Sequence, residues 1–116
     1  MAEKVRDLRS ALALLEQMPD QLIETDVEVD PMAELAGVYR YVGAVKRPTK
    51  EGPAMIFNHV KGHPDAKVAI GLLASRKRVA ALLDTRPENL GKMLCKSVEN
   101  PIPPVDFKGD APCQQV

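Results

Sequence analysis

Residues 54–73 read AMIFNHVKGHPDAKVAIGLL, and this stretch organises the rest of the chain. Residues 54–60 form a compact apolar run that is typical of a strand, and residues 66–73 form a second such run. The residues between them, 61–65, contain a glycine and a proline and predict a turn. We therefore expect an antiparallel hairpin, with the remaining segments packed around it.

The segments before this hairpin change from a helical period to a strand period. Residues 7–18 predict a helix, because apolar residues recur at three- and four-residue steps and form one stripe. The stripe consists of Val5, Leu8, Leu12, Leu15 and Met18. In residues 21–29 the period becomes two, which predicts a half-buried strand with an acidic outer face. Its inward positions are Ile23, Thr25, Val27 and Val29.

A second helix is predicted to begin at Asp30-Pro31, because aspartate caps helices well and proline suits the first helical turn. Gly43 is its expected C-cap. The shared face of this helix consists of Met32, Leu35, Ala36, Tyr39 and Val42. Residues 45–53 then predict a basic surface loop, since they include two prolines and a glycine.

Two more helices and an extended tail are predicted after the hairpin. Ser75 can cap a helix over residues 76–83, and a further helix starts at Pro87 and runs to about residue 98. The inward residues of the latter are expected to be Leu90, Met93, Leu94 and Val98. The order of elements indicates an α+β fold, a small mixed sheet with helices packed on one face. We expect residues 1–104 to form this domain and residues 105–116 to form a linker.

The composition limits what such a domain can do. The chain has 116 residues, 45% of them apolar, which is enough for one modest core, but aromatics are only 3% and prolines number ten. Sixteen basic and sixteen acidic residues cancel, so no overall field favours nucleic acid or a membrane surface. There is no apolar signal core, and Cys95 and Cys113 lack a metal or disulfide-framework spacing. These features favour a cytoplasmic protein with reduced thiols.

Two possible sites of chemistry are weak at the level of sequence. His59 and His63 are four residues apart, which would suit a metal on a helix, but Gly62 and Pro64 interrupt any helix there. A turn histidine and a half-exposed strand histidine are the expected arrangement. Cys113 would need a neighbouring base to act as a nucleophile, and the sequence identifies none.

Asp26, Glu28 and Asp30 alternate on one face of the predicted strand. Paired carboxylates can do acid–base work when burial separates their pKa values. Because the opposite face already holds the apolar residues, we expect these three carboxylates to form a solvated strand face.

Basic residues gather in the middle of the chain. Residues 1–34 hold three basic and nine acidic groups, whereas residues 35–78 hold nine basic and two acidic groups. Residues 46–50, Lys-Arg-Pro-Thr-Lys, could bind a phosphate or carboxylate but lack the glycine spacing of a phosphate-binding loop. Arg76, Lys77 and Arg78 lie at a predicted helix start, where the helix dipole disfavours cations, so this cluster needs an acidic surface or an anion as its partner. A salt bridge is the default expectation, and anion binding is the alternative.

An ordered set of short motifs extends along nearly the whole chain. The motifs are Glu24-Thr25-Asp26, Val29-Asp30-Pro31, Glu34-Leu35-Ala36-Gly37-Val38-Tyr39-Arg40, Gly43-Ala44, Val45-Lys46-Arg47-Pro48-Thr49, Gly52-Pro53-Ala54-Met55, Phe57-Asn58, Lys61-Gly62, Ala74-Ser75-Arg76-Lys77-Arg78 and Ala111-Pro112-Cys113-Gln114. Together they resemble the N-terminal region of UbiD-type decarboxylases, most of all the hydroxybenzoate branch with its protocatechuate, gallate and vanillate decarboxylases.

This resemblance implies reversible, non-oxidative decarboxylation of a protocatechuate-, gallate-, vanillate- or 4-hydroxybenzoate-type acid. It implies prenylated FMN as cofactor, together with Mn²⁺ and K⁺. It places the catalytic, cofactor-binding and metal-binding residues in a middle domain absent from this chain, so none is assigned here. The expected partners are the cofactor-binding and C-terminal domains of the parent protein, an aromatic acid substrate and further copies in a homo-oligomer.

The chain departs from the family pattern at two places. The Gly-Gly-Thr insertion that the family usually has between Ala44 and Val45 is missing, and Asp84 stands where a glycine commonly follows paired leucines.

Two functions other than that of the parent decarboxylase stay open. The first function is that of a stand-alone binding or regulatory module derived from the domain. The second, nucleic-acid binding through residues 46–50 and 76–78, lacks both net positive charge and stacking aromatics.

Overall fold

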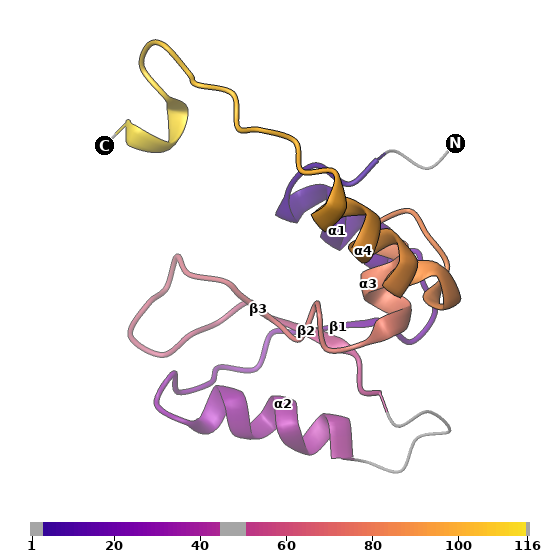
Figure 1. Ribbon diagram of the computed structural model, residues 1–116. Coiled ribbons are helices and arrows are strands. Elements are labelled where there is room, and N and C mark those ends of the chain that lie inside the picture. The colour runs from indigo at the N-terminus through magenta and orange to yellow at the C-terminus, as the bar shows by residue number, and fades with distance from the viewer. Residues whose placement is uncertain (1–3, 45–50, 116) are drawn as a thin grey trace.

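The computed structural model describes residues 4–44 and 51–115 of the chain (Figure 1). In chain order the elements are α1 (Leu8–Glu16), β1 (Leu22–Thr25), α2 (Glu34–Ala44), β2 (Ala54–Phe57), β3 (Val68–Ile70), α3 (Arg76–Leu82), the 3-10 turn η1 (Pro87–Asn89), α4 (Leu90–Glu99) and the 3-10 turn η2 (Pro112–Gln114). Within these described residues, no helix is both long and apolar enough to cross a membrane.

The described strands form one mixed sheet in the order β1-β2-β3. β1 runs parallel to β2, with Ile23 opposite Met55, and β2 runs antiparallel to β3, with Phe57 opposite Val68. The predicted hairpin and the predicted α+β class with a small mixed sheet are confirmed. The two hairpin strands are shorter than predicted, because residues 58–67 form a loop between them.

Helices cover both faces of the sheet rather than one, as Figure 1 shows, so that part of the prediction is wrong. Parallel strands cannot be joined by a tight turn and need a crossover connection. The α2 helix makes this crossover between β1 and β2 and lies on one face. On the other face, α1 contacts both β1 and α3.

The hydrophobic core lies between α2 and the sheet. Its buried members are Val29, Leu35, Met55 and Phe57. The half-buried side chains that pack against them are Ile23, Val38, Tyr39, Val42, Val68 and Ile70. A second buried layer comes from α1 and α3, in which Ala11, Leu15 and Ala80 are buried. The chain therefore builds two thin apolar layers, one on each side of the sheet.

The first helix begins with a capping box. The Asp7 carboxylate accepts a hydrogen bond from the Ser10 backbone N–H at 2.8 Å, and the Ser10 hydroxyl accepts one from the Asp7 N–H at 3.1 Å. This exchange satisfies two donors that a helix start leaves free. The predicted start at Asp7 is confirmed, and the helix ends slightly early, at Glu16. Within the predicted stripe, Leu15 is buried but Leu8 is exposed.

The strand β1 ends at Thr25, well before the predicted end at residue 29. The Thr25 side-chain oxygen accepts a hydrogen bond from the Val27 N–H at 3.3 Å, which turns the backbone out of the sheet. Val27, expected to face inward, is therefore 68% exposed. The chain returns at Val29, which forms a single parallel bridge with Val60.

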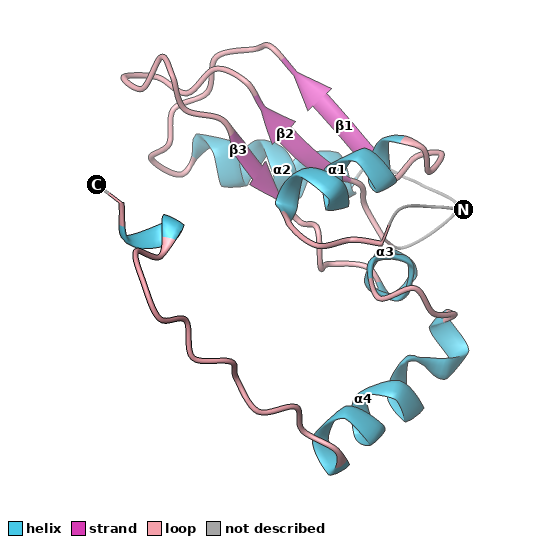
Figure 2. Cartoon of the chain, turned by 90° about the horizontal axis from the view of Figure 1, so that it is seen from above, coloured by secondary structure: helices cyan, strands magenta, loops and turns pink. Residues whose placement is uncertain are grey.

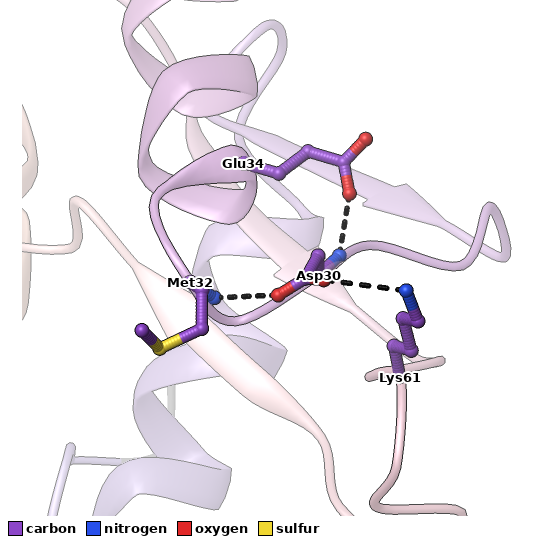
Figure 3. Close-up of polar contacts among 4 residues, drawn as sticks. All are labelled: Asp30, Met32, Glu34 and Lys61. Carbon is purple, nitrogen blue, oxygen red and sulfur yellow. Dashed lines mark hydrogen bonds and ion pairs between the residues drawn. The ribbon is translucent and has the colours of Figure 1, made fainter.

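The start of α2 also differs from the prediction (Figure 3). Asp30 does not cap a helix at Pro31; its carboxylate accepts a hydrogen bond from the Met32 N–H at 2.8 Å and closes a turn. Ala33 has a φ of 71°, a left-handed conformation, so the helix begins only at Glu34. The Glu34 carboxylate reaches back to accept a hydrogen bond from the Asp30 N–H.

The predicted inner face of α2 is correct for Leu35, Tyr39 and Val42 but wrong for the other two residues. Met32 precedes the helix and is exposed, and Ala36 is exposed as well. Gly43 is not a C-cap, because the helix continues to Ala44. A glycine at position 52 is needed beside it, since a Cβ atom there would lie 2.6 Å from the Gly43 Cα.

Candidate docking surface

Arg78 occupies the junction of α3 with the sheet and is completely buried. Its guanidinium group donates to the carbonyl oxygens of Gly52 at 2.8 Å and Gly71 at 2.9 Å. It also donates to the Leu72 carbonyl at 3.3 Å and to the Gln21 side-chain oxygen at 3.2 Å. Arg78 therefore ties together three distant segments and does not belong to an exposed anion-binding cluster.

A carboxylate from the same domain lies at the basic start of α3. The Ser75 hydroxyl donates a hydrogen bond to Glu51, and the Arg76 N–H donates to the other Glu51 oxygen at 3.4 Å. The bond from Ser75, the Arg76 N–H and the charges of Arg78 and Arg76 lower the pKa of Glu51 against the opposing effect of desolvation. Glu51 is thus an acidic neighbour of this cluster, held by the Ser75 hydroxyl and the Arg76 N–H, while the described hydrogen bonds of the Arg78 guanidinium go to carbonyl and amide oxygens in place of the expected salt bridge. Ser75 is also the predicted cap, accepting from the Arg78 N–H at 3.3 Å.

The carboxylates near the end of β1 make structural contacts. The Asn58 side-chain amide donates to both Glu24 and Asp26 at 2.8 Å. Asp30 forms an ion pair with Lys61 at 3.4 Å, and its pKa is lowered first by the hydrogen bond from the Met32 N–H. The expected solvated face is largely correct, because Glu24, Asp26 and Glu28 are exposed and Asp30 is half-buried.

The two histidines and Cys113 are not brought together. His59 and His63 are exposed and lie in the loop between β2 and β3, and Cys113 is exposed on η2. Residues 46–50 lie outside the described residues, as does the junction of Ala44 with Val45. In the part of the chain that the structure describes, no three histidine, cysteine or acidic side chains form a group that could hold a metal. These residues do not fit the metal that the family resemblance implies, so no step of a reaction is assigned to them.

An uncovered apolar stripe on α4 is the most distinctive surface of the described chain. Leu90, Leu94 and Val98 are four residues apart and therefore share one face of the helix. Their exposed fractions rise from 7% to 49% to 81% along the helix. The prediction that this face points inward is correct for Leu90, while Met93 is half-buried. It is wrong for Leu94 and Val98, because α4 leaves the body of the domain.

Apolar side chains continue beyond α4 into the extended segment that follows. Ile102, Val105 and Phe107 are all exposed. No described hydrogen bond ties residues 101–110 to the rest of the domain. Figure 2 shows α4 and this segment standing away from the sheet. We call α4 and residues 101–107 the docking arm.

The sequence predicted the apolar stripe on α4, but it did not show what covers that stripe. A stripe at helical spacing predicts an apolar partner without saying whether that partner lies in the same domain. The burial of Arg78 could not be predicted from a local sequence pattern, because its acceptors belong to residues that are far apart in the chain.

Comparison with known proteins identifies the domain. The profile of the 3-octaprenyl-4-hydroxybenzoate carboxy-lyase N-terminal domain family matches residues 12–98. A gallate decarboxylase of Lactiplantibacillus plantarum is 51% identical over 120 residues, which cover 100% of this chain and 24% of that protein. An uncharacterised protein of Chlamydia trachomatis is 36% identical over 81 residues, covering 70% of this chain and 13% of its own length.

Solved structures agree with this match. The apo 3,4-dihydroxybenzoic acid decarboxylase of Klebsiella pneumoniae is 50% identical, with a TM-score of 0.76 over 86% of this chain and 21% of its own. The corresponding apo enzyme of Enterobacter cloacae is 53% identical, with a TM-score of 0.78 over 89% of this chain and 22% of its own. The chain thus spans between a fifth and a quarter of these decarboxylases. The resemblance read from the sequence is confirmed, and the chain belongs to the UbiD family of carboxy-lyases, in which it corresponds to the N-terminal domain.

Proposed function

We propose that this chain serves as the N-terminal domain of an enzyme that decarboxylates a hydroxylated aromatic acid, reversibly and without oxidation. The observation that carries the proposal is the match to a gallate decarboxylase along the whole chain. Gallate and 3,4-dihydroxybenzoate, named in the relatives, are benzoates with ring hydroxyl groups. The proposed substrate class is therefore a phenolic acid of the protocatechuate, gallate, vanillate or 4-hydroxybenzoate type.

In this proposal the chemistry belongs to the region that follows the domain. Prenylated FMN, with Mn²⁺ and K⁺, supplies the electron sink for CO₂ loss there. Residues 1–104 form the domain, and residues 105–116 lead to the cofactor-binding domain. Residues 101–110 form no helix or strand, which supports a linker in this region. The parent enzyme is a cytoplasmic homo-oligomer, and the free thiols of Cys95 and Cys113 fit a reducing compartment.

The role of this domain is to shape the enzyme. It packs on the cofactor domain and can close over the active site as a hinged body. Its exposed apolar arm supports such a role, since apolar surface of this kind marks interaction sites. Within the domain, Arg78 keeps the sheet and α3 in one arrangement and so fixes where the arm emerges.

A chimera tests this function. This chain replaces the corresponding region of the Lactiplantibacillus plantarum gallate decarboxylase, and CO₂ release from gallate and 3,4-dihydroxybenzoate is measured. We expect the cofactor-loaded chimera to release CO₂ and the 116-residue chain alone to release none. A folded, cofactor-loaded chimera without activity would overturn the proposal, and so would decarboxylation by the isolated chain.

A stand-alone binding module is the second candidate. The exposed arm favours it, because such a surface could equally serve an independent partner. Purification from the native host separates the two functions. A stable complex with a separate, non-catalytic subunit would support the module, whereas recovery of this sequence within a longer decarboxylase would exclude it.

A further inference from the structure

The docking arm has a defined chemical character. Lys92 and Lys96 lie one turn apart on the face of α4 opposite the apolar stripe, because each is two positions away from a stripe residue. A shallow depression on the lysine-bearing side of α4 is lined by Asn89, Lys92, Met93, Lys96, Ser97 and Asn100. The arm therefore presents an apolar stripe on one face of α4 and positive charge with amide groups on the other face.

The exposed fractions of the stripe residues show which part of α4 is free to contact a partner. Leu90 is buried against this domain, whereas Val98, two turns later, is almost free of contacts from it. The surface left free for a partner is therefore the second half of α4 and the segment after it.

We propose that the docking arm lies in an apolar groove formed by the part of the decarboxylase that follows this domain in the same polypeptide. This inference rests on the proposed function. The family places this domain at the N-terminus of proteins four to five times its length, as the 21–24% coverage shows. The polypeptide that leaves the arm after residue 107 thus tethers it to the region that forms the groove.

The tether favours the same polypeptide over a second copy. The residues after α4 can span only about 3.3–3.6 Å each when extended, so the region that follows stays tethered to α4 at all times. A short tether raises the effective concentration of its partner to the millimolar range. An amphipathic helix laid into a groove is also a recurrent way of joining protein parts, with anchors at four-residue steps like those on α4.

Hydrogen exchange measures the docking directly. Backbone amides of residues 94–107 are followed by mass spectrometry in the chain alone and in the chimera with the gallate decarboxylase. We expect exchange in this segment to slow by at least about tenfold in the chimera, while β2 changes little because it is already buried. Equal exchange rates of residues 94–107 in the two proteins would overturn the proposal.

Two valine variants supply the matched comparison. Val98→Asp places a charge on the stripe, and Val27→Asp places the same charge on an exposed loop of the same domain. Both residues are exposed, so both variants should keep the urea midpoint of the isolated chain. In the chimera, Val98→Asp should restore fast exchange in the arm and Val27→Asp should not. An equal effect of both variants would show that the stripe is not the docking surface.

The remaining outcomes separate this inference from the proposed function. An active chimera whose arm stays unprotected overturns the docking site but leaves the proposed function intact. A protected arm in an inactive chimera supports docking and counts against the function. If the chain alone sediments at twice 12.7 kDa with a protected arm, a second copy occupies the stripe and the inference is wrong.

Discussion

Arg78 holds a positive charge inside the domain with backbone carbonyls as its main partners. Burial lowers the pKa of Arg78, and Tyr39 and Glu51 act in the opposite direction. An arginine suits this position better than a lysine, because its planar group donates along several fixed directions at once. Its acceptors belong to segments before β1, before β2 and after β3, so a single side chain fixes how these segments meet.

Replacing Arg78 with methionine should destabilise the chain strongly. Methionine keeps much of the volume but leaves four acceptors without their donor, and each unsatisfied buried acceptor costs about 1–3 kcal/mol. We expect a loss of at least about 3 kcal/mol in the free energy of urea unfolding. Lys77→Met is the control, since Lys77 is exposed on the same helix and should change little. Similar losses for both variants would contradict the role given to Arg78.

Three carboxylates make the stability of the domain depend on pH. The pKa of Glu51 is lowered first by the Ser75 hydroxyl, that of Asp7 by the Ser10 N–H, and that of Asp30 by the Met32 N–H. A carboxylate with a lowered folded pKa stabilises the fold fully above its ordinary pKa, which is 4.5 for Glu51 and 3.8 for the aspartates. That contribution is lost as the pH falls through the folded pKa.

The urea midpoint should therefore decrease between about pH 6 and about pH 3. Glu51→Gln should be less stable than the unaltered chain at the higher pH, and the two should converge at the lower one. A constant difference between them across this range would show that the Glu51 charge contributes nothing.

At the scale of elements, two glycines with the same backbone conformation have different surroundings. Gly62 and Gly71 have φ values of 80° and 79°, a region that disfavours other residues. A Cβ atom on Gly62 would meet nothing within 4 Å, whereas one on Gly71 would lie 2.3 Å from the Tyr39 hydroxyl oxygen. The strand β3 therefore needs a glycine at its end so that α2 can pack closely.

Alanine substitutions at Gly62 and Gly71 separate the cost of a left-handed backbone from the cost of crowding Tyr39. Gly62→Ala should cost about 1–2 kcal/mol in unfolding free energy, the penalty for a left-handed residue. Gly71→Ala should cost clearly more, because Tyr39 must also move, and Tyr39→Leu in the same chain should recover part of that excess. Equal costs at the two glycines would show that the contact with Tyr39 is not tight.

Local patterns predicted most elements of this fold but not their ends. The capped starts of α1 and α3 and the hairpin of β2 with β3 follow from residues close together in the chain. The end of β1 at Thr25 could not be read from alternation, because Val27 continues the pattern while its N–H bonds to the Thr25 side chain. Likewise, Ala33 fits a helix by propensity, yet its left-handed backbone delays α2 until Glu34.

The candidate site was predictable only in part for a similar reason. The stripe on α4 was visible as a pattern, but a pattern does not say which molecule covers it. Leu90 meets its own domain, and Val98 does not. Arg78 stood in a basic cluster for which a salt bridge was expected and anion binding was the alternative, whereas its main acceptors are carbonyls that only the folded chain brings together.

As a whole, the described chain consists of a sheet with a thin apolar layer on each side and an exposed docking arm. Aromatics make up 3% of its residues, and the core beside α2 is built mainly from aliphatic side chains. Exposed apolar side chains accumulate from Leu94 to Phe107, at the end of the domain nearest to the rest of the polypeptide in its relatives. A domain that relies on a neighbour can leave this surface uncovered until the two meet.

The central claim is that this domain works in a decarboxylase by docking through its arm. The most direct test is the rate of CO₂ release from gallate by two chimeras with the Lactiplantibacillus plantarum enzyme, one carrying Val98→Asp and the other Val27→Asp. We predict that Val98→Asp lowers the rate by at least about tenfold relative to Val27→Asp. Equal rates from two folded, cofactor-loaded chimeras would contradict the claim.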